Sequence, residues 1–115
     1  MIVVKNKREL KALINQRIEE QGPNCDLNDI DVSGIADMSF LFYGTNFNGN
    51  ISLWNVSKVM FMDGMFAWSE FNGDISNWNV SNVINMSKMF YKSPLDGKEP
   101  RWYRGIEVKL LRRYI

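Results

Sequence analysis

The sequence predicts an α/β solenoid of three strand-turn-helix repeats with parallel strands, closed by a helical N-terminal cap and a divergent C-terminal cap. The main observation is a segment that returns after 24 residues, as Trp54-Asn55-Val56-Ser57 does at Trp78-Asn79-Val80-Ser81. A period of this length is typical of repeat proteins, in which each unit buries its apolar face against its neighbours. Within each copy, an alternating apolar pattern precedes one with helical spacing.

The copies divide the chain into one domain, 1–115, with five segments. The sequence from Phe47 to Phe66 aligns with that from Phe71 to Phe90, and a weaker copy precedes both. Leu95-Asp96-Gly97 resembles the start of a fourth copy, which does not continue. The expected segments are an N-terminal cap at 1–22, repeats at 23–46, 47–70 and 71–94, and a C-terminal cap at 95–115.

The N-terminal cap is expected to be a helix over residues 6–20. Asn6 and Glu9 have the spacing of a capping box, and Gly22-Pro23 would end the helix. Residues 2–4 are apolar and partly β-branched, which favours a short edge strand or a lid. The apolar residues at helical spacing are Leu10, Leu13, Ile14 and Ile18.

Each repeat is expected to contain a strand followed by a short helix. Residues 52–57 alternate between polar and apolar, apart from Leu53, which indicates a strand with Trp54 and Val56 facing inward. From Val59 to Phe66 the apolar residues share one face of a helical wheel. Asparagines recur at fixed sites, where their side chains stabilise turns.

The C-terminal cap breaks the period. Ile106, Val108 and Leu110 alternate, which favours a strand over a helix, although Leu111, Tyr114 and Ile115 suit either.

Composition argues against catalysis and against a bound metal or cofactor. The chain has no histidine, which removes His-based triads and the usual zinc spacings, and its single cysteine, Cys25, precludes an intramolecular disulfide. The acids recur at surface positions of the repeat without a convergent set. We therefore expect no enzymatic activity, no metal site and no cofactor. The net charge is +1, with basic ends around an acidic middle.

Hydropathy gives no membrane span. No stretch approaches the roughly 20 apolar residues that a membrane helix requires. The apolar stretch at the start of the sequence is too short for the apolar core of a signal peptide. We expect a cytoplasmic protein as the sequence is written, or a cell-surface protein if a leader has been removed.

The repeat resembles that of the BspA-like leucine-rich-repeat surface proteins and mycoplasma-type lipoproteins. The resemblance lies in Phe-Asn-Gly-Asp-Ile-Ser-x-Trp-Asn-Val-Ser-Asn-Val-x-x-Met-x-x-Met-Phe at residues 71–90, and in its altered copy at 47–66. It implies a leucine-rich-repeat-like solenoid that binds other macromolecules, often at a cell surface, and no catalytic residues. For this chain, as the sequence is written, we expect only three units and neither an export signal nor a lipid anchor.

Candidate binding residues are those that break the repeat, because positions alike in every copy serve the fold. Exposed aromatic residues gathered on one face are typical of protein interfaces. The candidates are large apolar residues whose counterparts are polar or glycine: Phe40 (Gly64, Lys88), Leu53 (Asp29, Asn77), Phe61 (Asp37, Asn85) and Trp68 (Gly44, Lys92). The alternative is that they are buried beneath the loops between copies.

A second candidate site lies in the C-terminal cap. Basic and aromatic residues alternate there, a pattern of surfaces that stack on single-stranded nucleic acid. The residues are Arg101, Trp102, Tyr103 and Arg104. An ordinary cap is the competing interpretation.

The function expected from these observations is a non-catalytic protein-protein interaction module. Its partner is a protein or a second copy of the chain, and nucleic acid is an alternative partner. Two other functions compete. One is a small inhibitor, encoded by a phage or mobile element, that offers acidic repeats to a nucleic-acid-targeting defence complex of the host. The other is a fragment of a bacterial surface adhesin or lipoprotein.

Overall fold

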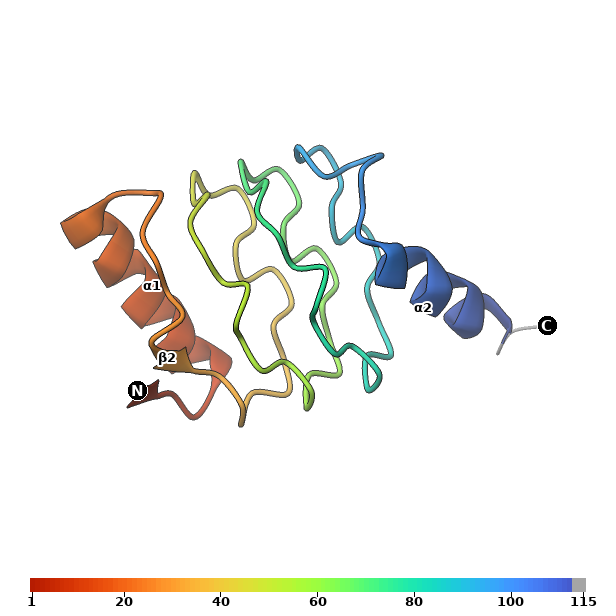
Figure 1. Ribbon diagram of the computed structural model, residues 1–115, viewed down its shortest axis with the longest axis horizontal. Coiled ribbons are helices and arrows are strands. Elements are labelled where there is room, and N and C mark those ends of the chain that lie inside the picture. Colours follow the sequence, from red (N-terminus) through yellow and green to blue (C-terminus); the bar gives the residue numbers. More distant parts are fainter. Residues whose placement is uncertain (113–115) are drawn as a thin grey trace.

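The chain forms a row of irregular turns between two helices (Figure 1). This computed structural model describes residues 1–112. The regular elements are β1 (Ile2–Val3), α1 (Lys7–Gln21), β2 (Ile30–Asp31) and α2 (Arg101–Arg112). The radius of gyration is 13.5 Å, close to the value of about 13 Å expected of a compact domain of this length.

Helix α1 confirms the helix expected over residues 6–20. The Asn6 side chain accepts a hydrogen bond from the Glu9 amide at 2.9 Å, which caps the first turn. Gly22, at φ 88°, ends the helix, and its amide donates to the Ile18 carbonyl. Leu10 and Ile14 are fully buried, so one face of α1 covers the first turns of the row.

Strand β1 lies beside the first copy. It pairs in parallel with β2, with Ile2 opposite Ile30 and Val3 opposite Asp31. The apolar N-terminal residues therefore form the short edge strand that the sequence favours.

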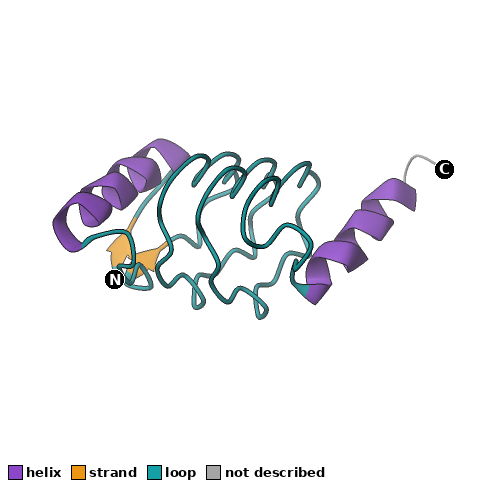
Figure 2. Cartoon of the chain, turned by 90° about the horizontal axis from the view of Figure 1, so that it is seen from above, coloured by secondary structure: helices purple, strands orange, loops and turns teal. Residues whose placement is uncertain are grey.

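The predicted α/β solenoid of strand-turn-helix repeats is wrong. Across residues 23–94 the structure has one strand of two residues, β2, and no helix. The copies contact one another through isolated parallel bridges, such as Asp37 with Phe61 and Phe61 with Asn85. Turns make up most of this region, as Figure 2 shows. A repeat with its own strand and helix, as in leucine-rich-repeat proteins, is absent from these described residues.

The expected helix over residues 59–66 does not form because its amides are used elsewhere. From Met62 onward every second amide donates to the following copy, whereas the amides of Met65 and Ala67 donate three residues back, to Met62 and Gly64. An α-helix would need these groups for bonds to the fourth residue back. The bonds between copies are Met62 to Asn85, Gly64 to Ser87, Phe66 to Met89 and Trp68 to Tyr91, all 2.8 or 2.9 Å.

The expected strand over residues 52–57 is replaced by turns for a related reason. The side chains of Asn50 and Asn55 accept hydrogen bonds from the amides of Ser52 and Ser57, two residues on. Such local bonds compete with a strand ladder. The third copy repeats both turns at Asp74 and Asn79.

The core is a set of aromatic columns through the turns. Phe42, Phe66 and Phe90 stack with centroid distances of 5.5 and 5.7 Å and nearly parallel rings. Phe47 and Phe71 form a second column at 6.0 Å. Equivalent residues 24 positions apart thus lie in register, and their stacked rings help to hold neighbouring copies together.

The C-terminal cap contains a helix, so the preference for a strand there was wrong. Helix α2 begins at Arg101, and Ile106 packs against the core. The side chains of Val108, Leu110 and Leu111, and residues 113–115 including Tyr114 and Ile115, lie outside the described part of the structure. No helix within residues 1–112 has the length and hydropathy needed to cross a bilayer.

Candidate functional site

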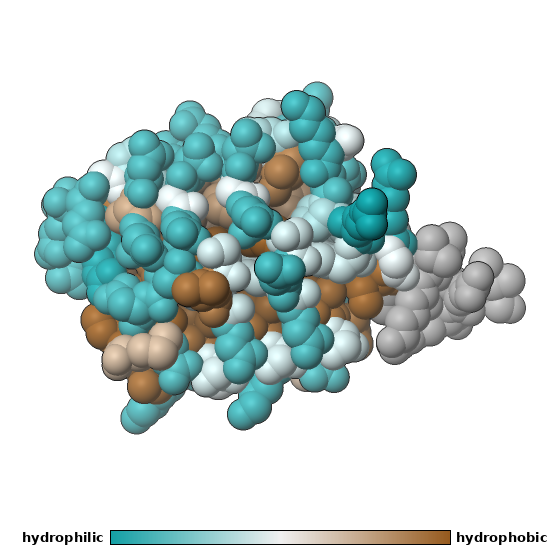
Figure 3. Space-filling view, viewed as in Figure 1, coloured by the Kyte–Doolittle hydropathy of each residue, from teal (hydrophilic) through white to brown (hydrophobic). Residues whose placement is uncertain are grey.

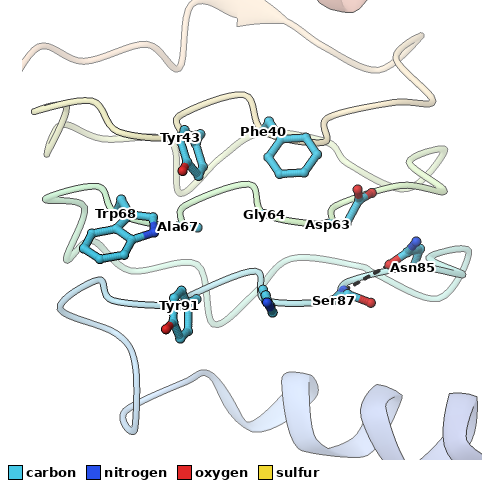
Figure 4. Close-up of a pocket in the computed structure, with 10 residues that line it drawn as sticks. Phe40, Tyr43, Asp63, Gly64, Ala67, Trp68, Asn85, Ser87 and Tyr91 are labelled. Atoms are coloured by element: carbon cyan, nitrogen blue, oxygen red, sulfur yellow. Dashed lines mark hydrogen bonds between the residues drawn. The ribbon is translucent and has the colours of Figure 1, made fainter.

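An aromatic groove crosses three neighbouring turns of the row (Figure 4). Phe40 and Tyr43 come from the first copy, Gly64, Ala67 and Trp68 from the second, and Tyr91 from the third. The hollow has a volume of about 320 Å³. Its lining residues are Phe40, Tyr43, Asp63, Gly64, Ala67, Trp68, Asn85, Ser87, Lys88 and Tyr91, and we call this set the aromatic groove.

Two of the groove's aromatic residues have backbone conformations that favour glycine. Phe40 lies at φ 58° and Trp68 at φ 59°. Their equivalents in other copies have the same conformation, including the glycines Gly64 and Gly44 at φ 61° and 68°. A left-handed conformation costs a non-glycine residue about 1–2 kcal/mol, and such residues cluster at functional sites. The left-handed conformation therefore belongs to the turn in every copy, and at Phe40 and Trp68 the residue that adopts it is aromatic.

Small residues make the floor of the groove. A Cβ atom on Gly64 would collide with the Phe40 ring, so this ring lies directly over the glycine. Ala67 is buried, and its equivalents in the neighbouring copies are Tyr43 and Tyr91. The hollow therefore exists because the middle copy has Gly and Ala where its neighbours have larger side chains.

Edge-to-face contacts fix the rings at both sides of the groove. Phe40 meets Tyr43 with centroids 5.9 Å apart, and Trp68 meets Tyr91 at 5.8 Å. Such pairs contribute about 0.5–1.5 kcal/mol beyond their buried area. The rings are thus held in place while Phe40 and Trp68 stay 54% and 55% exposed.

Cationic side chains flank the groove. The ammonium groups of Lys88 and Lys92 lie over the Tyr91 ring, at 5.5 and 5.7 Å from its centroid. On the other side, Phe40 also lines a second hollow, of about 530 Å³, between α1 and the first copy. Its lining residues are Lys7, Arg8, Lys11, Ala12, Asn15, Ser39, Phe40 and Leu41.

Two of these cations are held by the first copy. Lys7 Nζ contacts Asp37 Oδ2 at 3.2 Å and donates to Ser39, whereas Lys11 Nζ donates to the Leu41 carbonyl at 2.6 Å. Partial burial lowers the pKa of Lys11. Burial opposes ionisation of Asp37, but hydrogen bonds from Ser39 and Lys7 bring its pKa below the usual value.

Residues 10–102 match the model of a family described as Mycoplasma protein of unknown function, DUF285. The chain belongs to the DUF285 family. BspA-like repeat proteins are also in the DUF285 family, so the sequence resemblance is confirmed at that level, whereas the specific leucine-rich-repeat assignment is not. Searches of the curated proteins and of the solved structures found no match.

The segment shared with the DUF285 family contains the whole aromatic groove, because it runs from α1 to the start of α2. The second hollow begins slightly earlier, at Lys7 and Arg8. Among residues 1–106, whose side chains the structure describes, no cluster of His, Cys, Asp or Glu is arranged to hold a metal ion.

The structure brings together two of the four predicted binding residues. Phe40 and Trp68 line the groove, whereas Leu53 and Phe61 do not. Leu53 is 79% exposed, and its amide donates to the Asn28 side chain. Phe61, 37% exposed, forms the bridges to Asp37 and Asn85. Figure 3 shows that apolar surface lies in several patches among hydrophilic side chains on one face of the molecule.

Sequence reasoning missed Tyr43 and Tyr91. The sequence criterion selects large apolar residues whose counterparts are polar or glycine, whereas at this site two copies have tyrosine and the middle copy has the small residue Ala67. The sequence feature that could have found them is a small residue in the middle copy at a position where both neighbouring copies have a large aromatic residue.

The basic-aromatic segment 101–104 has a structural explanation. Trp102 stacks on Trp78 with centroids 6.5 Å apart, and Tyr103 meets Phe90 edge-on at 5.2 Å. Both aromatic side chains are partly buried against the core, while Arg101 and Arg104 are exposed. The aromatic pair therefore packs on the third copy.

Proposed function

We propose that the chain is a non-catalytic protein-binding module whose partner docks in the aromatic groove. The observation that carries this proposal is the strained, exposed pair Phe40 and Trp68, held around a floor of Gly64 and Ala67. Binding energy at protein interfaces concentrates in aromatic anchors and the pockets they meet. The resemblance to BspA-like proteins, which implies binding of macromolecules, supports the same function.

The experiment compares captured proteins between matched variants. Each variant replaces an exposed apolar residue of the middle copy with its equivalent from the third copy: Trp68→Lys in the groove, and Leu53→Asn or Phe61→Asn outside it. Purified, tagged protein is used to capture partners from a lysate of the source cells, which are then identified by mass spectrometry.

The proposal expects a partner that Trp68→Lys loses and that both control variants retain. Thermal unfolding of each variant establishes that the fold persists. Capture that is unaffected by Trp68→Lys, or that depends on Leu53 alone, would contradict the proposal.

A further inference from the structure

We propose that the aromatic groove receives a bulky apolar side chain from an acidic segment of the partner protein, whose carboxylates contact cations at the two sides of the groove. This inference rests on the proposed function and adds the chemistry of the partner. It follows from the charge around the groove, its volume and the way its rings are held.

Charge around the groove is predominantly positive. Phe40 joins the two hollows into one surface, whose charged lining residues are Asp63 and the cations Lys7, Arg8, Lys11 and Lys88. Four cations and one carboxylate line this surface, whereas the whole chain has a net charge of only +1, so the surface is more positive than the chain as a whole. Complementary potentials steer partners and select among them. An acidic partner is the one that this surface attracts.

Two of the cations are suited to contact a partner. Of the lining cations, Lys7 is paired with Asp37 and Lys11 with the Leu41 carbonyl. Arg8 and Lys88 are exposed, and the two ion pairs found among the described residues involve neither of them. They lie at opposite sides of the shared residue Phe40, one in each hollow.

The volume of the groove fits a side-chain anchor. An apolar cavity of about 150 Å³ accommodates benzene. The hollow of about 320 Å³ between the rings therefore has room for one large aliphatic or aromatic side chain. Asp63, within the groove, disfavours a carboxylate at its centre, so the partner's acids belong at the sides.

A cationic ligand fits this groove poorly. Aromatic cages bind quaternary ammonium groups through exposed ring faces. Here the ammonium groups of Lys88 and Lys92 already lie over Tyr91 and would repel a second cation.

Single-stranded nucleic acid also fits less well than a peptide. Its binding surfaces offer ring faces to successive bases. In the groove, Phe40 lies over Gly64, and the Phe40–Tyr43 and Trp68–Tyr91 pairs are edge-on. The rings thus enclose one hollow instead of forming a row of stacking platforms.

The test uses short fluorescent peptides with a central Trp or Leu flanked by acidic, neutral or basic residues, and a peptide with acidic flanks around a central Ser. Binding is measured by fluorescence polarisation at low and at high salt. We expect the acidic peptides with an apolar centre to bind at least about tenfold more tightly than the other peptides. High salt should reduce the affinity of these acidic peptides more than that of the others.

Variants then separate the anchor from the charges. Trp68→Lys should reduce the affinity for the acidic peptide with an apolar centre by about thirtyfold or more, as expected for loss of an interface anchor. Arg8→Glu and Lys88→Glu should each reduce the affinity for the acidic peptide. The double variant should bind the basic-flanked peptide more tightly than the acidic one. Lys58→Glu, the same charge change at a residue that lines neither hollow, should leave binding unchanged. Circular dichroism of each variant checks the fold.

Three results would overturn the inference: equal binding of basic and acidic peptides, no binding of any peptide, or tighter binding of oligothymidylate that depends on Trp68. Self-association of the chain that Trp68→Lys abolishes would also do so, because the groove would then take a second copy. If no peptide binds while Trp68→Lys still loses a captured partner, the proposed function stands, and only the inference that the partner segment is acidic is wrong.

Discussion

The indole Nε1 of Trp102 donates a hydrogen bond to the Ile75 carbonyl at 2.8 Å. Trp54 and Trp78 make the same bond to the carbonyls of Leu27 and Ile51, which lie 48 and 24 residues before Ile75. The repeat therefore continues to Trp102, beyond the Leu95-Asp96-Gly97 segment where the sequence comparison ended, and this tryptophan in the first turn of α2 packs against the core.

Replacing Trp102 should destabilise the fold. Trp102→Ala removes a stacked, partly buried indole and leaves the Ile75 carbonyl without this donor, so we expect a loss of about 2–4 kcal/mol in the free energy of unfolding. Trp102→Phe should cost about 1–2 kcal/mol, because it keeps most of the stacking. Urea unfolding measures both, and unchanged stability of Trp102→Ala would contradict its role in the core.

Replacing Trp68 with glycine should have a small effect on stability. The glycine relieves the left-handed backbone, which offsets the lost contact with Tyr91, and we expect a change within about 1 kcal/mol. Trp54→Gly, at a buried indole, should instead cost several kcal/mol. A large loss for Trp68→Gly in thermal unfolding would show that this ring is structural.

Replacing Phe61 with asparagine should leave stability unchanged or raise it by up to about 1 kcal/mol. In the neighbouring copies, Asp37 and Asn85 accept hydrogen bonds from the amides of Ser39 and Ser87. Phenylalanine has no side-chain acceptor for this hydrogen bond, and asparagine would supply one. Phe61→Leu, which keeps an apolar side chain and lacks the acceptor, is the control, and denaturant midpoints give the comparison.

Replacing Gly49 with alanine should destabilise the fold by more than about 1 kcal/mol. A Cβ atom there would collide with the Cys25 carbonyl, so the backbones of two adjacent copies would have to separate. Gly34→Ala is the matched control, because nothing lies within 4 Å of a Cβ atom at that position. Equal unfolding midpoints for the two variants would contradict the close packing at Gly49.

Stability should fall as the pH drops below about 4. Hydrogen bonds from Arg17 lower the pKa of Asp29, and those from Ser33 and Ser76 lower the pKa of Asp31 and Asp74. A carboxyl group with a depressed folded-state pKa contributes stability above its unfolded value, about 3.9, and loses it as the pH falls through the folded value. Unfolding midpoints between about pH 7 and about pH 3 measure this, and Asp29→Asn should reduce the slope.

The sequence was most informative where local chemistry decides the structure. The Asn6 cap and Gly22 delimit α1 close to the expected residues, and the recurring Asn and Asp side chains make the expected turns. These features depend on residues within a few positions of one another.

The sequence failed where hydrogen bonds between copies replace local ones. The apolar spacing from Val59 to Phe66 suits a helix, but the same residues face the core in a chain of turns whose amides pair with the next copy. Periodicity identifies the buried face and does not identify where the backbone groups bond.

Only part of the candidate site could be predicted from the sequence, for a similar reason. Phe40 and Trp68 stand out because their equivalents include Gly64 and Gly44, and shared left-handed backbones explain that exchange. The floor at Ala67, with Tyr43 and Tyr91 beside it, became recognisable only when the turns were placed next to one another.

The pairing of β1 with β2 has a consequence for how molecules of this chain meet in solution. Unpaired backbone at the margin of such a row would be a template for polymerisation. Ile2 and Val4 donate amide hydrogen bonds to the Asp29 and Asp31 carbonyls, so these acceptors are already occupied. Because β1 has only two residues, its outer edge has few backbone groups with which another chain could pair. This end of the row is therefore a poor template for fibre growth.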